Sequence, residues 1–318
     1  MTGQNGLSSS VVETVAGFTA GIASTISLHP LDLVKIRLQV DRSHSSRLGS
    51  SLRIIRQIAR HEGGLAAFYR GLGPNLVGNS TGWGLYFLCY GSLKDIVGRY
   101  RARDGDGAQG PLTSSDYFLT SGTAATTGII TSALTNPIWV IKTRMLSTGS
   151  QVPGAYTSLS SGVKQIYATE GVKGFYRGLV PALFGVSHGA LQFMAYERLK
   201  ILRSDSMRLD DPVERGLSDS VQAKPSLARL GNIDFFVLSG LSKVFAGCVT
   251  YPYQVVRSRL QTYEAHLLYR GTTDAMRQIW VKEGFAGFYK GLGPNLFRVL
   301  PSTWVTFLVY ENMKLFLS

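Results

Sequence analysis

Apolar residues in this chain gather into six long stretches that are separated by polar and basic segments. These stretches predict helices over residues 11–40, 73–97, 116–147, 180–202, 233–262 and 293–317. Each stretch is about 20–30 residues long, which is enough to cross the ~30 Å hydrocarbon core of a membrane with some tilt. The pattern therefore predicts an all-α membrane protein with six transmembrane helices and with both ends on the same side.

Three shorter helices are predicted in the polar segments that follow the first, third and fifth stretches. They lie near residues 51–61, 158–168 and 272–282. In the first of them, one helix face carries Leu52, Ile55, Ile58 and Ala59. Because long helix, short helix and long helix follow one another three times, the chain is predicted to contain three tandem units.

Two sequence motifs return in step with this plan. The first runs from a proline to an arginine and reads PLDLVKIR at 30–37, PIWVIKTR at 137–144 and PYQVVRSR at 252–259. The second joins Glu-Gly to Phe-Tyr-basic-Gly, and its three copies begin at Glu62, Glu170 and Glu283. Such repetition of two motifs in one order identifies internal repeats. The predicted organisation is a disordered segment at 1–10, repeats at 11–103, 114–203 and 232–318, and a polar connector at 204–231.

The composition favours a membrane protein over a soluble nucleic-acid-binding protein. The net charge is +13, yet only 17% of the residues are charged and 44% are hydrophobic. A soluble protein that binds nucleic acid is usually richer in charge and clusters it. Here the basic residues fall largely at segment ends, where they can meet anionic lipid headgroups. No Lys or Arg precedes Lys35, so any targeting signal is expected to be internal rather than a basic leader.

The paired motifs resemble those of the mitochondrial carrier family over nearly the whole chain. The resemblance implies a six-helix bundle with threefold pseudosymmetry that moves metabolites across the inner mitochondrial membrane by alternating access. It also implies a monomer whose other partners are membrane lipids, cardiolipin in particular. Residues 137–144 are similar to the second signature of carriers for FAD, folate, NAD and pyrimidine nucleotides. Residues 187–197 and 251–257 look like those of the FAD and folate branch.

A gate on the matrix side is implied by the first motif. Its prolines, which should kink the odd-numbered spans inward, are Pro30, Pro137 and Pro252. Its gate positions are Asp32, Lys35, Trp139, Lys142, Gln254 and Arg257. By the family's pairing, Asp32 is expected to meet Lys142. Lys35 and Arg257 are expected to lack carboxylate partners, because Gln254 and Trp139 occupy the other two acid positions.

A second gate, on the cytoplasmic side, is implied near the ends of the even-numbered spans. Its residues are Lys94, Glu197, Lys200, Glu311 and Lys314. The expected pairs are Glu197 with Lys314 and Glu311 with Lys94, while Gly91 stands where the first repeat would carry its acid. The alternative is that these residues form ordinary pairs three positions apart on helix surfaces.

Residues that break the threefold pattern are candidates for binding an asymmetric substrate. Lys243 and Arg298 are cations inside apolar spans, where charge is costly and usually functional. The other repeats have glycine at the matching positions, namely Gly21, Gly128, Gly78 and Gly185. These glycines are expected to leave room for a bulky ligand.

Further candidates for the binding site are aromatic and polar residues on the spans. They are Trp139, Asn79, Trp83, His188 and Gln192. Trp139 displaces a gate carboxylate and could stack on a planar ring, whereas Trp83 and His188 have packing roles as alternatives. The predicted substrate is a planar, bulky anion, with FAD first, folate second, and NAD or pyrimidine nucleotides as further candidates.

The sequence contains no catalytic constellation, metal-ligand cluster or P-loop. FAD is therefore expected as cargo and not as a cofactor, and the chain is not expected to be an enzyme. Two other classes stay open. One is a receptor or adaptor that keeps the carrier fold without transporting, and the other is a soluble helical-repeat protein.

Overall fold

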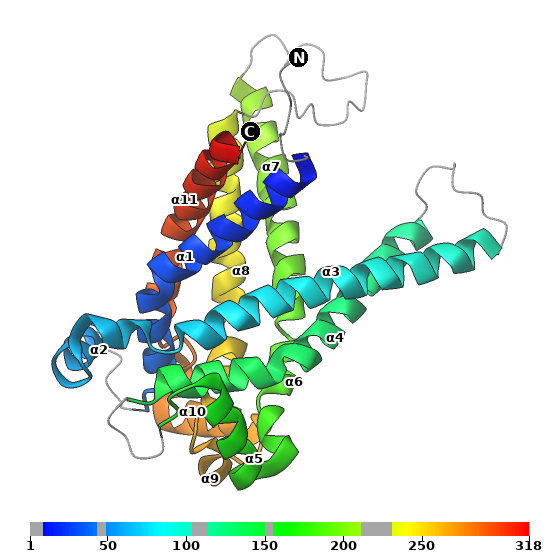
Figure 1. The fold of residues 1–318 in the computed structure, drawn as a ribbon. Helices are drawn as coiled ribbons and strands as arrows, with labels where there is room; N and C mark the ends of the chain where they lie inside the picture. The colour runs from blue at the N-terminus through cyan, green and yellow to red at the C-terminus, as the bar shows by residue number, and fades with distance from the viewer. Residues whose placement is uncertain (1–8, 43–48, 104–113, 150–154, 211–230, 318) are drawn as a thin grey trace, which may run out of the picture. The chain divides into compact units, whose positions relative to one another are not determined.

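The computed structural model describes residues 9–42, 49–103, 114–149, 155–210 and 231–317 (Figure 1). These residues form helices and connecting turns, and no β-strand occurs among them. The all-α prediction is therefore confirmed for this part of the chain. The predictions for the N-terminal segment and the polar connector fall largely on residues outside these ranges.

The six long helices and the short helices between them occur along the chain in the order that the sequence predicts. The long helices are α1 (Ser9–Val40), α3 (Leu72–Arg103), α4 (Ser114–Ser147), α7 (Val186–Asp210), α8 (Asn232–Leu260) and α11 (Leu292–Leu317). The short ones are α2 (Ser50–His61), η1 (Gly64–Tyr69), α5 (Leu159–Phe175), α6 (Leu179–Leu183), α9 (Ala265–Leu268) and α10 (Thr272–Gly287). The fourth predicted span is divided between α6 and α7. The prolines of the first motif lie inside α1, α4 and α8.

The chain divides into two compact units. The first comprises Met1–Val186 and Pro252–Ser318, and the second comprises Ser187–Tyr251. In the first unit α1 packs along α11, and α3 packs along α4 (Figure 1). In the second unit the Arg203 guanidinium on α7 donates to the Asp234 carboxylate on α8 at 3.0 Å.

The helices differ in their suitability for a membrane. By length and composition, one described segment, Asp234–Leu260, is apolar and long enough to cross a bilayer. A second candidate joins Leu159–Phe175 to Leu179–Ser206 across a bend of 55°. The order of the helices agrees with the sequence-based prediction. By length and composition, however, fewer of the described helices are suited to cross a membrane than the six expected.

Glycines of the second motif explain why that motif recurs. Gly71, Gly178 and Gly291 have φ angles of 76°, 72° and 84°, in the left-handed region that only glycine enters without strain. Each one ends a turn and lets the chain start the next helix in a new direction. The motif thus sets the entry to α3, α6 and α11.

The short helix α2 turns a different face to the core than its sequence suggests. Ile58 is fully buried and Ile54 and Ile55 pack against the core cluster, whereas Leu52 is 59% exposed and Ala59 is exposed. The expected face was therefore partly wrong. Apolar residues recur with helical spacing on both faces of α2. The contacts of α2 with α1 and η1 determine which face is buried.

Candidate functional site

Each repeat ties its two motifs together with an ion pair. The arginine that ends the first motif meets the glutamate that opens the second. The three pairs are Arg37–Glu62 at 2.7 Å, Arg144–Glu170 at 2.6 Å and Arg259–Glu283, all with little exposed side-chain surface. The pair of Arg37 with Glu62 has two parallel hydrogen bonds, which is the strongest geometry for such groups.

The same arginines also link the repeats to one another. The Nε atom of Arg37 donates to the Leu146 carbonyl at 2.7 Å, and that of Arg259 donates to the Gln39 carbonyl at 2.9 Å. In the second repeat, Arg144 Nε donates to the Gln261 carbonyl at 3.4 Å. Each acceptor lies at or just beyond the C-terminal end of an odd-numbered span, where helix carbonyls lack internal partners. We call this closed set of contacts the arginine ring.

Sequence analysis did not assign a role to the arginine ring. Two signals could have found it, namely the arginine at the last position of all three first motifs and the glutamate before the glycine in all three second motifs. Their separation along the chain hides the fact that they meet in space.

Two glutamates of the ring have shifted pKa values. Burial tends to raise the pKa of Glu170, but hydrogen bonds and the charges of Arg144 and Arg177 bring it below its ordinary value. Glu283 behaves in the same way, because Arg259 and Lys290 lower its pKa despite burial. Both carboxylates are consequently ionised over the physiological pH range.

The gate positions of the first motif come together in the first unit, with three different kinds of contact. The Lys35 ammonium donates to Gln254 Oε1 at 3.1 Å, which joins α1 to α8. The Trp139 ring lies 6.0 Å from the Arg257 guanidinium carbon, which joins α4 to α8. Lys142, one helical turn along from Trp139, places its ammonium 4.7 Å from the same ring. Lys35 and Arg257 therefore have neutral partners at the two positions without a carboxylate.

Asp32 has a different partner from the one expected. Its carboxylate forms an ion pair with Arg298 on α11, whereas the family pairing predicts Lys142. Arg298 is long and enters from the adjacent helix, since α1 and α11 pack closely. A candidate substrate-binding cation and a predicted gate carboxylate are thus in direct contact.

The matrix-gate cluster carries an excess of positive charge. Electrostatic interactions join the following side chains: Asp32, Lys35, Lys142, Arg257 and Arg298. Four cations therefore share one carboxylate. An anion that enters this cluster would relieve repulsion among these half-buried cations.

The glycines that were expected to leave room for a ligand are partly covered. A Cβ atom on Gly78 would lie 3.5 Å from the Trp139 indole, and one on Gly128 would lie 3.1 Å from Val186. At Gly185 the Tyr253 hydroxyl would be 3.5 Å away. Only beside Gly21, among these four positions, is the space within 4 Å open. The expectation of open space was therefore wrong for three of the four in this arrangement.

The other predicted binding residues are found in both units. In the first, Asn79 donates to Thr25 and Asn75 at 3.5 Å, and Trp83 is 64% exposed. In the second, His188 Nδ1 lies 2.9 Å from the Thr250 hydroxyl. Thr250 donates its own proton to the Ala246 carbonyl, so His188 is the donor to Thr250. Lys243 is exposed and Gln192 is half-buried.

Among the residues predicted for the cytoplasmic gate, Lys200 has its ammonium 5.6 Å from the Tyr196 ring centroid. Glu197 accepts from Lys200 at 2.9 Å, three positions along α7, which is the helix-surface pairing given as the alternative. Glu311 and Lys314 are exposed on α11, and the Lys94 side chain lies outside the description. The pairing of Glu197 with Lys314 and of Glu311 with Lys94 stays a prediction.

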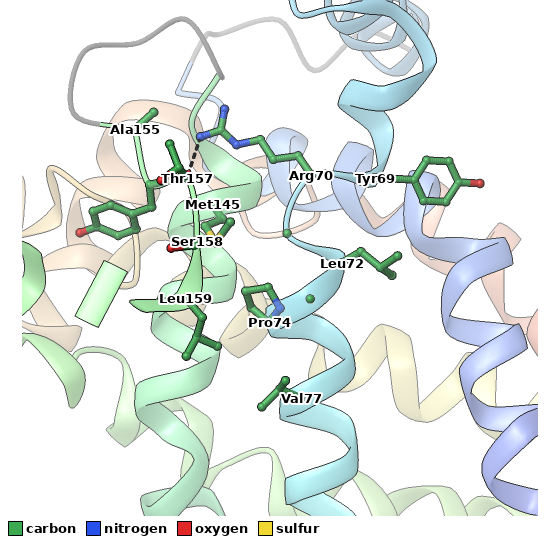
Figure 2. A pocket seen from close by; sticks show the side chains of 13 residues that line it. Tyr69, Arg70, Leu72, Pro74, Val77, Met145, Ala155, Thr157, Ser158 and Leu159 are labelled. Carbon is green, nitrogen blue, oxygen red and sulfur yellow. Dashed lines mark hydrogen bonds between the residues drawn. The ribbon is translucent and has the colours of Figure 1, made fainter. Parts of the chain in front are cut away.

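A pocket of about 670 Å³ opens where α3 begins and α5 is about to begin. Figure 2 shows Arg70 reaching across it, with a hydrogen bond of 3.2 Å to the Tyr156 carbonyl. The other guanidinium nitrogen of Arg70, Nη1, is buried and has no acceptor in the described part of the chain. In the other repeats the equivalent cations, Arg177 and Lys290, contact the ring glutamates. Arg70 is therefore the member of this set that is directed into a pocket.

The chain thus has three tandem repeats of helices, each with an arginine–glutamate pair and a hydrogen bond from its arginine to a backbone carbonyl of another repeat, which is the plan of a membrane carrier. A sequence model of the mitochondrial carrier protein family matches residues 7–101, 113–206 and 229–318. The chain belongs to this family.

Three relatives indicate the branch of the family. The mitochondrial FAD carrier protein FLX1 of Saccharomyces cerevisiae is 38% identical, and the match covers 95% of this chain and 96% of that protein. Folate transporter 1, chloroplastic, of Arabidopsis thaliana is 37% identical over 94% of this chain and 92% of its own length. Nicotinamide adenine dinucleotide transporter 2, mitochondrial, of the same plant is 35% identical over 95% of this chain and 78% of its own length. The relatives are organellar transporters, so a transporter of this branch is supported.

Proposed function

We propose that the chain is a transporter of the inner mitochondrial membrane that moves FAD by alternating access through six spanning helices. Folate is the second candidate, and NAD and pyrimidine nucleotides follow. The proposed substrate-binding residues are Arg298, Lys243, Trp139, Asn79, Trp83, His188 and Gln192.

The observation that carries this proposal is the excess of cations in the matrix-gate cluster. Arg298 lies within it and holds Asp32, so an anionic group of the substrate would compete with Asp32 for the same guanidinium. A pyrophosphate suits this exchange because guanidinium groups bind phosphate oxygens through two hydrogen bonds. The relative named as a mitochondrial FAD carrier, similar over nearly the full length of both chains, supports FAD over the others.

Alternating access requires that contacts at the two ends of the bundle form and break in turn. At the matrix end, Lys35–Gln254 and Trp139–Arg257 are weak contacts between neutral groups and cations. Such contacts can break at moderate energetic cost when substrate binding compensates. At the cytoplasmic end, the proposed pairs would take over as the matrix end opens.

Membrane lipid is proposed as the second partner, with cardiolipin as the lipid. The Arg70 pocket supports this idea, because a buried guanidinium nitrogen without an acceptor favours an anionic headgroup. Apolar surface continues from the pocket at Val77, which is 46% exposed and could contact acyl chains.

The proposal is tested by reconstituting the protein in liposomes and measuring uptake of labelled FAD, folate, NAD and UTP side by side. We expect FAD to be taken up fastest. The Arg298→Gln variant should bind FAD about 10- to 100-fold more weakly, because a hydrogen bond to a charged group is lost. Arg56→Gln, on the exposed face of α2, is the matched control and should bind as the wild type does.

Two outcomes would contradict the proposal. Uptake of folate but not FAD would change the substrate, and full FAD affinity in the Arg298 variant would remove Arg298 from the site. A protein that folds in the membrane and moves none of the four compounds would favour the receptor or adaptor class.

A further inference from the structure

Trp139 lies at the centre of several independent contacts in the first unit. It occupies an acid position of the gate, on α4. The Lys142 ammonium is 4.7 Å from its ring centroid and the Arg257 guanidinium carbon is 6.0 Å away. Both distances lie within the range over which a cation is attracted to the negative face of an aromatic ring.

The indole is also seated against a glycine. A Cβ atom on Gly78 would lie in van der Waals contact with the indole Cζ2 and Cη2 atoms at 3.5 Å, and 3.3 Å from Ile138 Cγ2. The corresponding residue in the third repeat is Arg298. The space next to Gly78 is thus bordered by the indole and by Ile138.

From these contacts we propose that Trp139 is a gate residue that replaces a carboxylate by cation–π attraction and holds α4 to α8 through Arg257. The contact with Lys142 is within one helix, and it orients the ring and shields the lysine charge. The contact with Arg257 is between helices and corresponds to the ion pair that an acid at this position would make. This inference depends on the proposed transport function only for its role in a gate, because the contact itself forms without substrate.

A neutral gate residue has a physical advantage in this cluster. A carboxylate at position 139 would bind Arg257 firmly and would also compete for Lys142 and any anion-binding cation nearby. An indole attracts the same cations by a smaller energy and leaves their hydrogen-bond donors available for an anionic substrate. The gate would then be released more easily when the substrate arrives.

The decisive experiment replaces Trp139 with tryptophan carrying one, two or three fluorine atoms on the ring. Fluorine weakens the negative face of the ring stepwise and changes its size little. The measurement is the thermal unfolding temperature of the substrate-free protein in detergent. We expect a stepwise fall that reaches about 2–4 °C in total. The same series at Trp280, which is 60% exposed on α10, is the matched control and should leave the temperature unchanged.

A flat response at Trp139 would overturn the proposal and leave packing as the role of the ring. Ordinary variants provide a second test that does not need modified residues. Trp139→Glu should unfold at a higher temperature than Trp139→Leu, because a carboxylate restores an attraction for Arg257 and leucine does not. A leucine variant as stable as the wild type, or more stable than the glutamate variant, would also refute the cation–π role. A failure of FAD uptake in the wild type would refute the proposed function and leave these stability results unaffected.

Discussion

The arginine ring and the matrix-gate cluster both use residues of the first motif on α1, α4 and α8, but the ring contacts are alike in the three repeats and the cluster contacts differ. In the ring, every repeat uses an arginine, a glutamate and a backbone carbonyl in the same arrangement. In the cluster, the three acid positions hold Asp32, Trp139 and Gln254, and each makes a different contact.

We expect this difference to separate residues that maintain the fold from residues that respond to a ligand. A contact that joins repeats in a fixed geometry benefits from being the same in all of them. A site for an asymmetric molecule cannot be symmetric, because each helix meets a different part of the ligand. We therefore expect the ring to contribute stability and the cluster to contribute specificity, and mutations can test each expectation.

The largest effect is expected from breaking the ring. Glu170→Gln leaves the Arg144 guanidinium buried without its carboxylate, since their side chains are only 4% and 1% exposed. Removing one partner of such a pair costs about 3–5 kcal/mol, so the unfolding temperature in detergent should fall markedly. Glu62→Gln and Glu283→Gln should have effects of similar size if the ring is symmetric.

Acid should weaken the ring without any mutation. The pKa values of Glu170 and Glu283 are lowered in the folded protein, so their stabilising contribution is present above their ordinary pKa. It is lost as the pH falls through the lowered values. The glutamine variants should show a smaller loss of stability over this acidic range, and an identical loss in variant and wild type would contradict the assignment.

The next largest effect is expected from reversing the single carboxylate of the cluster. Asp32→Lys places another cation among four and should abolish FAD uptake. Two charge swaps then identify the partner. Asp32→Arg with Arg298→Asp should restore the stability of the substrate-free carrier, and Asp32→Lys with Lys142→Asp should restore part of the uptake if that pair forms during transport.

These two swaps distinguish the contact in the structure from the one expected from the family. Recovery of stability by the Lys142 swap alone would place Asp32 with Lys142 in the substrate-free state. Recovery by neither would show that something other than ion pairs holds this end of α1.

The smallest effect is expected at the predicted cytoplasmic gate, where the first repeat lacks an acid at Gly91. Gly91 has open space around the position of a Cβ atom, so Gly91→Glu can be accommodated. The new carboxylate should add a third pair, raise stability by at most about 1 kcal/mol and slow turnover. Gly84→Glu on the same helix also has open space and serves as the control. A faster carrier or an unchanged unfolding temperature would count against the pairing scheme.

Sequence reasoning located the helices well because their patterns are local. The long apolar stretches, the short amphipathic helices and the glycines that redirect the chain all depend on neighbours within a few turns. The partner of Asp32 could not be predicted in the same way. Helical spacing indicates the face on which a charge lies, but several long cations can reach that face, and packing decides which one does.

The role of Trp139 shows a second limit. Its position among the gate acids was visible in the sequence, and stacking against a ligand was the natural interpretation. The contacts of the Trp139 ring with Gly78 and with the two nearby cations form only where α3, α4 and α8 meet. Such a contact leaves no periodic signal along the chain.

The arginine ring also has a direction. The first repeat donates to the second, the second to the third, and the third back to the first. Loss of one arginine therefore removes contacts from two repeats at once. The glutamate of its own repeat loses its ion pair, and the helix carbonyl of the next repeat loses its hydrogen bond. Because the three hydrogen bonds between repeats form a closed cycle, breaking one of them leaves the other two to hold the repeats together.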